Sequence, residues 1–384
     1  MIFDRSLNLP ELLSKKSFFL FGPRGVGKSH LIRHSLGEDA LVINLLKSSH
    51  LTRLLHNPSE LEEIIDAEPS KKKIVVIDEV QKVPALLDEV HRLIEERHIK
   101  FLLTGSSARR LKAGGANLLA GRAWLASLFP LTFHEIGGKD FNLEKYLRYG
   151  SLPAVWLSDD PAEQLDAYLQ TYINEEVKAE GAIRKIPAFM DALRSAALSN
   201  GQLINFASIA RDAGVSPPTV ASYFQILEDT LIGFQLQPWK KPTSRKSVAT
   251  AKFYFFDPGV VNAMTGTEHL ERNSNLYGEL FEQFVALELR AYLSYTRTKK
   301  NLYFWRTEER DEVDFIVDDL FAVEVKSTRH VQPKYLESLR LLREEKLLKN
   351  YIIVSQDTVD RDSGGILCLH WKSFLTRLWR HEFS

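Results

Sequence analysis

The sequence predicts an α/β fold that begins with a parallel sheet covered by helices on both faces. Short, continuously apolar runs alternate with helix-compatible stretches over residues 17–107, which is typical of parallel strands joined by crossover helices. A glycine-rich loop at residues 22–29 lies between such a run and a helical stretch, as a phosphate-binding loop does. We therefore expect the sheet of a P-loop nucleoside triphosphatase in this half of the chain.

The apolar runs place the elements of this half. Runs that favour strands cover residues 17–21, 40–46, 74–78 and 101–107. One helix is expected directly after the glycine-rich loop. A second is expected after Pro84, because Leu86, Val90 and Leu93 recur at helical spacing.

The glycine-rich loop fits the pattern G-x-x-x-x-G-K-[ST]. Gly25 and Gly27 let the backbone fold around a phosphate with its N–H groups inward, and the following helix N-terminus adds a favourable dipole. Lys28 is expected to reach the β- and γ-phosphates, and Ser29 to offer its hydroxyl to Mg²⁺. The predicted ATP-binding residues of the loop are Gly22, Pro23, Arg24, Gly25, Val26, Gly27, Lys28, Ser29 and His30.

Two acids end the strand at residues 74–78. Asp78 stands where a carboxylate can hold Mg²⁺ beside the loop, and Glu79 can orient and deprotonate the attacking water. This pair predicts a hydrolase rather than a passive nucleotide binder.

The next strand ends in hydroxyl-bearing residues and is followed by arginines. Ser106 is expected either to contact the γ-phosphate or to cap the next helix. Arg109, Arg110 and Arg122 come after it. Phosphoryl transfer often uses an arginine from a neighbouring subunit, and Arg122 is the first candidate for that role.

The middle of the chain predicts a helical lid and then a helix-turn-helix. Residues 142–200 are rich in helical spacing. Residues 206–213 and 217–230 are two short helical stretches joined by a turn with Gly214. A hairpin with a basic loop would follow, so the segment fits a winged helix. It would either touch DNA phosphates or serve only in packing. The expected basic residues are Lys240, Lys241, Arg245, Lys246 and Lys252.

The last third carries two acids and a lysine on adjacent strands. Glu324 and Lys326 lie two apart, so they share a face. An odd number of turn residues between the strands would put Asp314 opposite Glu324. Two such carboxylates suit Mg²⁺ or Mn²⁺, and a lysine can position water or stabilise a phosphate. This is the logic of metal-dependent phosphodiester cleavage.

These motifs resemble those of the AAA-type ATPases, and more narrowly a bacterial and archaeal group that adds a C-terminal PD-(D/E)xK nuclease-like domain. The resemblance implies ATP hydrolysis at a subunit interface, hence a homo-oligomer, expected as a hexameric ring. It also assigns Glu282 as a metal-binding acid of the first nuclease helix. One departure is Val313, which stands before Asp314 where many such enzymes have a proline. The expected domains are an ATPase core at 1–140, a lid at 141–200, a winged helix at 201–262 and a nuclease-like domain at 270–384.

Composition limits the class of protein. The 384 residues include 50 Lys+Arg and 50 Asp+Glu, so the net charge is zero and a globally basic nucleic-acid binder is excluded. With the single cysteine Cys368, no intramolecular disulfide can form. Neither a secretory signal nor a membrane-spanning run is recognisable, so a cytoplasmic protein is expected.

Together these features predict an oligomeric ATPase that acts on DNA, such as branched DNA in repair or recombination. Its C-terminal domain would bind or cut that DNA. The alternative is a nucleotide-dependent signalling switch or defence effector whose nuclease-like domain is catalytically silent.

Overall fold

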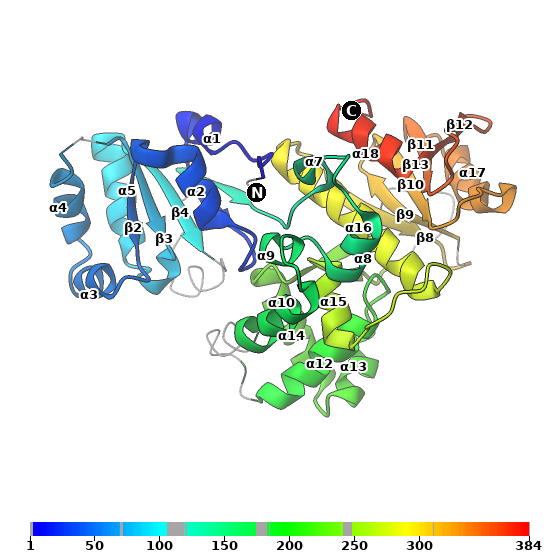
Figure 1. The fold of residues 1–384 in the computed structure, drawn as a ribbon, viewed down its shortest axis with the longest axis horizontal. Coiled ribbons are helices and arrows are strands. Elements are labelled where there is room, and N and C mark those ends of the chain that lie inside the picture. Colours follow the sequence, from blue (N-terminus) through cyan, green and yellow to red (C-terminus); the bar gives the residue numbers. More distant parts are fainter. Residues whose placement is uncertain are drawn as a thin grey trace. The chain divides into compact units, whose positions relative to one another are not determined.

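The structure is a computed structural model that describes residues 3–69, 72–105, 119, 121–173, 183, 185–240, 248–309 and 311–383. The chain forms two compact units. The N-terminal unit comprises residues 2–129 with 226–232, and the C-terminal unit comprises residues 130–225 and 233–384. Figure 1 labels helices and strands of both units.

The N-terminal unit is built on a five-stranded parallel sheet of order β2-β3-β4-β1-β5. Its strands are β1 (Ser17–Phe21), β2 (Ala40–Asn44), β3 (Ile74–Asp78), β4 (Lys100–Gly105) and β5 (Ala123–Ser127). Every residue of β1 is buried, as expected for a central strand covered on both faces. The α/β fold class is thereby confirmed.

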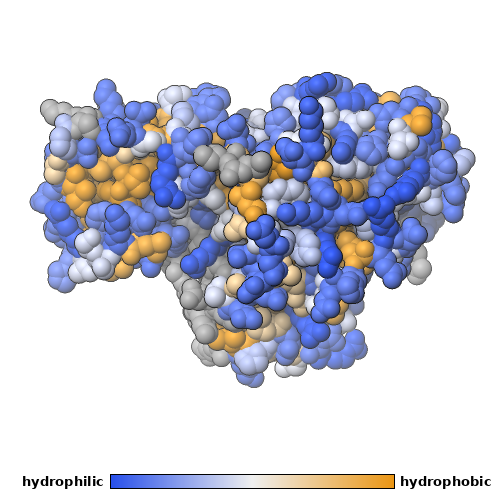
Figure 2. Space-filling view, viewed as in Figure 1, coloured by the Kyte–Doolittle hydropathy of each residue, from blue (hydrophilic) through white to orange (hydrophobic). Residues whose placement is uncertain are grey.

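Helices flank this sheet. They are α1 (Leu9–Lys15), α2 (Lys28–Leu36), α3 (Ser48–His56), α4 (Glu60–Asp66) and α5 (Leu86–Arg97). Leu54 of α3, Leu61 of α4 and Val90 of α5 share one apolar core with Ile77 and Leu103 of the sheet. Apolar surface also remains visible on this unit (Figure 2), and Val42, Leu46 and Leu55 are among its exposed large apolar side chains.

The C-terminal unit contains an eight-stranded mixed sheet of order β12-β13-β11-β10-β9-β8-β6-β7. The strands are β6 (Gly233–Pro238), β7 (Lys252–Phe255), β8 (Leu302–Arg306), β9 (Glu312–Val317), β10 (Phe321–Lys326), β11 (Asn350–Ser355), β12 (Arg361–Asp362) and β13 (Leu367–His370). Three neighbouring pairs are parallel, namely β6 with β8, β10 with β11 and β11 with β13.

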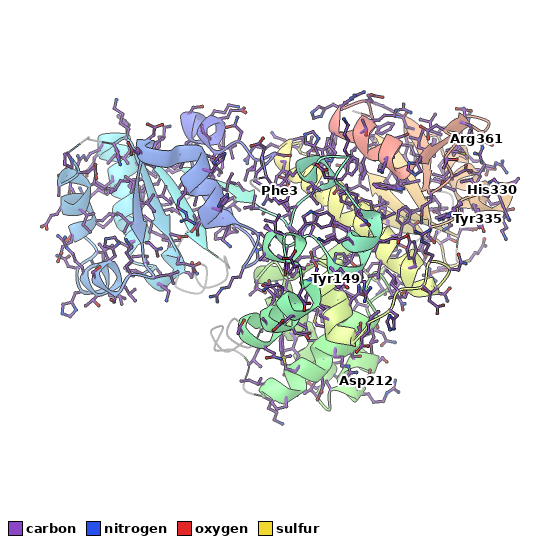
Figure 3. The ribbon with its side chains drawn as sticks, viewed as in Figure 1. Phe3, Tyr149, Asp212, His330, Tyr335 and Arg361 are labelled. Carbon is purple, nitrogen blue, oxygen red and sulfur yellow. The ribbon has the colours of Figure 1, made fainter. Side chains whose placement is uncertain are left out.

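The helices of this unit are α7 (Phe133–Ile136), α8 (Leu143–Tyr149), α9 (Pro153–Trp156), α10 (Pro161–Tyr168), α12 (Ile186–Leu198), α13 (Phe206–Asp212), α14 (Pro217–Asp229), α15 (Pro258–Thr265), α16 (Asn275–Tyr295), α17 (Glu337–Glu344) and α18 (Trp371–Trp379). The last part of α14 belongs to the N-terminal unit. Asp212 at the end of α13 accepts a 2.7 Å hydrogen bond from Ser195 of α12 (Figure 3). No helix in the described ranges is both long and apolar enough to cross a membrane.

The helix pair expected at residues 206–230 is present as α13 and α14, and a hairpin of β6 and β7 follows it. The hairpin does not stand apart. β6 also pairs with β8 through Gln237 and Pro238, so the hairpin extends the C-terminal sheet. Strand β7 is thereby brought close to the strands that carry the predicted nuclease-like residues.

Candidate functional site

The phosphate-binding loop leads from β1 into α2 with the backbone that its glycines allow. Gly25 and Gly27 have φ of 82° and 94°, values that side chains other than glycine rarely adopt. Gly22 is required for a different reason, because a Cβ there would lie 2.4 Å from the carbonyl oxygen of Leu128. The loop can therefore present its N–H groups at the start of α2, where an anion is favoured.

Lys28 is the first residue of α2 and only 8 % exposed. Its Nζ donates to the carbonyl oxygens of Gly22 and Pro23 at 2.6 and 3.1 Å. These bonds keep the ammonium within the loop, where incoming phosphates would meet it. Arg24, Gly25 and His30 are exposed, whereas Val26 is buried beneath the loop.

Asp78 lies at the end of β3 and faces hydroxyl groups from two directions. Ser29 Oγ donates to Asp78 Oδ2 at 3.2 Å, and the Thr104 hydroxyl donates to Asp78 Oδ1. The Ser29 and Asp78 oxygens therefore fit a Mg²⁺ ion that also binds nucleotide phosphates. The predicted Ser106 and the arginines Arg109 and Arg110 lie outside the described residues. Thr104 is a hydroxyl at this strand end whose bond to Asp78 the sequence did not indicate.

Glu79 follows Asp78 in the left-handed region, with φ of 64°. Its N–H donates to Thr104 Oγ1 at 3.3 Å, and Gln81 Nε2 donates to its carboxylate. Gly105 leaves the space for this arrangement, because a Cβ there would be 2.5 Å from Gln81 Oε1. Gln81 thus holds the side chain predicted to activate water.

A further residue that the sequence did not single out is Arg5. It donates from Nη1 to the carbonyl of Val26 at 2.8 Å and from Nη2 to that of Phe129 at 2.5 Å. Arg5 therefore ties the phosphate-binding loop to the segment after β5. The only signal in the sequence was an arginine before the first strand, which by itself indicates nothing.

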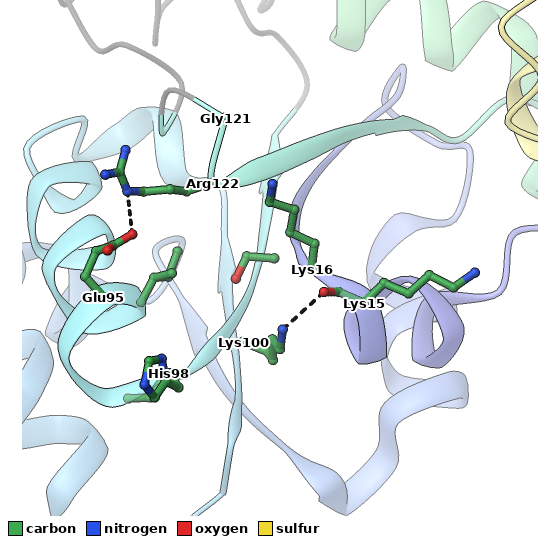
Figure 4. A pocket seen from close by; sticks show the side chains of 10 residues that line it. Lys15, Lys16, Glu95, His98, Lys100, Gly121 and Arg122 are labelled. Carbon is green, nitrogen blue, oxygen red and sulfur yellow. Dashed lines mark hydrogen bonds and ion pairs between the residues drawn. The ribbon is translucent and has the colours of Figure 1, made fainter.

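Arg122 stands just before β5, at the amino ends of the parallel strands, whereas the phosphate-binding loop follows their carboxyl ends. It lines a pocket together with Lys16 and Lys100, and its Nε donates to Glu95 Oε1 at 2.6 Å (Figure 4). Arg122 is therefore at the opposite edge of the sheet from the nucleotide loop of its own chain.

The second cluster lies in the C-terminal unit, on β9 and β10. These strands are antiparallel, with Val323 paired to Phe315, and the turn between them has three residues, Asp318 to Leu320. The same register puts Asp314 opposite Glu324, as the sequence predicts for an odd number of turn residues. Asp314 Oδ2 accepts from the backbone N–H of Val325 at 2.8 Å.

Lys326 and Glu282 join this pair. Lys326 Nζ lies 2.5 Å from Glu324 Oε1. Glu282, on α16, accepts a 2.5 Å hydrogen bond from the hydroxyl of Tyr254. One helix and two strands therefore bring the four residues predicted for this site close together, and the charges of their side chains interact.

The ionisation of the cluster reflects its burial. Burial, and then the carboxylates of Glu324 and Glu282, raise the pKa of Asp314 well above its usual range. Burial also raises the pKa of Glu324, although Lys326 opposes that effect. Burial disfavours the charge of Lys326, but Asp314 and Glu324 outweigh it and raise the pKa of that lysine. The ionisation state of each of these three side chains therefore depends on that of its neighbours.

Lys252 departs from its prediction. It was expected in an exposed basic wing, but it lies on β7, is 3 % exposed, and pairs with carboxylates of this cluster. The reason is that Lys252 lies within strand β7 of the C-terminal sheet, where its side chain points toward carboxylates of α16 and β9. Lys240 is exposed, and Lys241, Arg245 and Lys246 lie outside the described residues.

The metal prediction for this cluster stays a prediction. Among the residues that the structure describes, no three His, Cys, Asp or Glu side chains are arranged to hold a metal ion. Glu282, Asp314 and Glu324 are neighbours whose carboxylates interact with one another. The ammonium of Lys252 lies among them, 3.0 Å from Glu282 Oε1 and 4.0 Å from Asp314 Oδ1.

Comparison with known proteins agrees with the N-terminal site. Residues 14–137 match the family described as AAA domain. Residues 140–271 and 277–374 match two further families, each described as a domain of unknown function (DUF8612 and DUF4143).

Uncharacterized proteins of Mycobacterium tuberculosis and Mycobacterium bovis are each 30 % identical over 312 residues, covering 78 % of this chain and 67 % of the relative. An uncharacterized protein of Haemophilus influenzae is 23 % identical over 238 residues, covering 57 % and 58 %. Among solved structures, the Walker-type ATPase of Pyrococcus abyssi aligns with a TM-score of 0.46 at 16 % identity, covering 68 % of this chain and 96 % of that one. That last likeness is too distant to support a conclusion.

The loop, the β3 acids and the AAA match define the N-terminal part as a P-loop ATPase of the AAA type. The chain belongs to the same family as the two mycobacterial proteins.

Proposed function

We propose that this protein hydrolyses ATP with Mg²⁺ as a homo-oligomer and acts on DNA. The observation that carries the proposal is the arrangement around Asp78. Ser29 and Thr104 bond to its carboxylate, Lys28 lies within the loop, and Glu79 is the adjacent acid. This set supplies the phosphate, metal and water-activating groups of ATP hydrolysis.

Each of these residues has a distinct task. The loop N–H groups and Lys28 bind the phosphates, and Lys28 exchanges its carbonyl partners for phosphate oxygens. Ser29 and Asp78 would hold Mg²⁺, which neutralises charge that develops on the phosphates. Glu79 orients the water and accepts its proton. Arg5 and Gln81 keep the loop and Glu79 in place.

Self-association is supported by two features of the N-terminal unit. Arg122 stands at the opposite edge of the sheet from its own loop, so a neighbouring subunit is the site where it would stabilise transition-state charge. Exposed apolar side chains, including Val42 and Leu46, also suit an interface between subunits. A hexameric ring is the form that we propose.

DNA is proposed as the target of the C-terminal unit. The helix pair α13 and α14 supports this proposal, because Ser216 and Thr219, whose hydroxyls bond to each other at 2.8 Å, stand at the start of α14 where a phosphate is favoured. The grouping of Asp314, Glu324 and Lys326 on adjacent strands supports it as well. Branched DNA, such as a four-way junction, is the proposed substrate.

A second candidate function is a nucleotide-dependent switch with a catalytically silent nuclease-like domain. The observation in its favour is the ion pairing of Lys252 inside the acid cluster. In that function the ATPase would turn over slowly, and DNA would not stimulate it.

The test is ATP turnover of the full chain with and without single-stranded, duplex and four-way-junction DNA, with cleavage scored in the same tubes. Lys28→Ala should lower turnover by about 100-fold or more. We expect DNA to stimulate wild-type turnover. Asp314→Asn reports on the C-terminal cluster, and its matched control is Asp319→Asn in the turn, where the carboxylate pairs with Lys300 outside the cluster. No response to any of the DNAs would overturn the proposal and favour the switch.

A further inference from the structure

Lys252 occupies the interior of the acid cluster in the C-terminal unit. It lies on β7, and its side chain is 4 % exposed. Its Nζ contacts Glu312 Oε1 at 2.5 Å and Glu282 Oε1 at 3.0 Å, and it lies 4.0 Å from Asp314 Oδ1. Three carboxylates from α16 and β9 thus converge on one ammonium group.

The oxygens that remain for a metal ion are few. Glu282 Oε1 accepts from Tyr254 as well as Lys252. Asp314 Oδ2 accepts from Val325 N–H, and Glu324 Oε1 is paired with Lys326. Glu324 Oε2 is buried and has no hydrogen-bond partner. A hard divalent cation keeps several waters but still needs one or two carboxylates in near-regular geometry. Here the carboxylates of Glu282, Asp314 and Glu324 each already have one oxygen paired with a lysine or a backbone N–H.

The positive charge of Lys252 also disfavours a metal ion in this cluster. An ion bridging Glu282 and Asp314 would have to lie beside the Lys252 ammonium, and like charges at such a separation repel strongly in a buried site. The Lys252 ammonium already lies within 4.0 Å of carboxylate oxygens of Glu282, Glu312 and Asp314. A metal ion would therefore have to compete with this ammonium for the same carboxylates.

We infer that the Lys252 ammonium is the resident cation of this cluster and that the cluster binds no divalent metal. The geometry departs here from the metal-dependent nuclease centre that the sequence resemblance implies. The inference goes beyond the proposed function and does not depend on it, because ATP hydrolysis and DNA binding can each succeed or fail whatever this cluster holds. Its consequence is that the C-terminal unit does not cut DNA through a metal ion at Asp314 and Glu324.

The experiment is Mn²⁺ binding, followed by electron paramagnetic resonance on the full chain without nucleotide. Asp78→Asn is included in every sample so that the ATP site does not contribute. With Lys252 present, we expect no saturable Mn²⁺ site that depends on Asp314. Replacing the lysine by Lys252→Met should create one, with affinity increased by about tenfold or more, and adding Asp314→Asn should remove it. The matched control is Lys300→Met, at a half-buried lysine that pairs with Asp319 outside the cluster.

The outcomes separate clearly. Saturable Mn²⁺ binding by the chain that retains Lys252, lost on Asp314→Asn, would overturn the inference, and this result does not require any Lys252 variant to fold. A folded Lys252→Met that gains no Mn²⁺ site would overturn it too. If Lys252→Met is unstable because buried carboxylates lose their partner, thermal unfolding gives the readout. We then expect Mn²⁺ to raise the melting temperature of that variant and to leave the parent unchanged. A melting temperature equally insensitive to Mn²⁺ in both would count against the inference.

Discussion

Single side chains at strand ends carry the chemistry of the ATPase site. Asp78 accepts hydrogen bonds from the hydroxyls of Ser29 and Thr104, and Glu79 accepts one from the side chain of Gln81. Ser29 and Thr104 lie far from Asp78 in the sequence, so tertiary contacts position Asp78, whereas Gln81 holds Glu79 from only two residues away. A substitution that keeps the shape but removes the charge of one acid is therefore the most informative kind of variant.

Glu79→Gln should separate binding from hydrolysis. The amide can still accept the bond from Gln81 and fits the same space, but it cannot take a proton from water. We expect ATP turnover to fall by about 10²–10⁴-fold with nucleotide affinity little changed. Turnover is measured by phosphate release and affinity with a fluorescent ATP analogue. Retained turnover in this variant would remove Glu79 from the mechanism.

Glu288 of α16 makes a prediction about pH. It is 1 % exposed and accepts from Phe133 N–H at 2.6 Å and Trp379 Nε1 at 3.2 Å. Burial raises its pKa to about 8, against hydrogen bonds that lower it. Because the folded pKa lies above the ordinary value, its stabilising contribution is complete at low pH and is lost as pH rises through about 8.

Glu288→Gln mimics the protonated form, so it should remove that pH dependence. We expect the variant to lose less stability than wild type between about pH 5 and pH 9. Urea unfolding of the C-terminal unit at both pH values measures the difference. If the free energy of unfolding changes by the same amount between the two pH values in both proteins, Glu288 does not titrate in this range.

At the scale of elements, close backbone approach decides which helices can pack. Helix α15 is capped at its N-terminus by Asp257, whose carboxylate accepts from Ser151 N–H at 2.8 Å and Val260 N–H at 3.1 Å. Gly259 in its first turn lies against α8, where a Cβ would be 2.1 Å from the carbonyl oxygen of Tyr149. The contact is with backbone, which cannot move aside cheaply.

Gly259→Ala should therefore destabilise the C-terminal unit by about 1–3 kcal/mol or more. The matched control is Gly278→Ala within α16, where the nearest atom to a Cβ is Ser327 Oγ at 3.5 Å. That change should be neutral or stabilising by up to about 1 kcal/mol. Denaturant unfolding compares the two, and similar effects for both would contradict the packing argument.

For the whole molecule, the central question is whether one subunit completes the ATP site of another. Arg122 stands away from its own loop and pairs with Glu95 at 2.6 Å. An arginine that acts between subunits can be supplied by a different chain from the one that supplies Lys28. Two inactive variants can then complement each other.

Mixing Lys28→Ala with Arg122→Ala subunits should accordingly restore ATP turnover. In a ring of randomly mixed subunits, about a quarter of the interfaces would combine an intact loop with an intact arginine. We expect turnover to approach that fraction of wild type, whereas each variant alone is inactive. Glu95→Gln controls for loss of the local ion pair. Absence of any recovery would exclude Arg122 as the residue donated between subunits.

Much of the N-terminal fold could be predicted because its signals are local. The loop glycines, Lys28 and the acids after an apolar strand are adjacent in the sequence, and their spacing alone places them at one sheet edge. The pairing of Asp314 with Glu324 could be predicted on the condition that the turn has an odd number of residues, and the structure supplies a turn of three.

The partners of these residues could not be predicted in the same way. Arg5 reaches Phe129 across 124 positions, and Lys252 reaches Glu282 across 30. Neither pairing has a spacing rule, because each depends on how the strands order themselves within the sheets. The sequence by itself therefore determined the nucleotide loop, its acids and, for an odd number of turn residues, the pairing of Asp314 with Glu324, through local backbone geometry. Only the tertiary structure decided that Lys252 enters the acid cluster, because the place of β7 in its sheet arises from long-range packing.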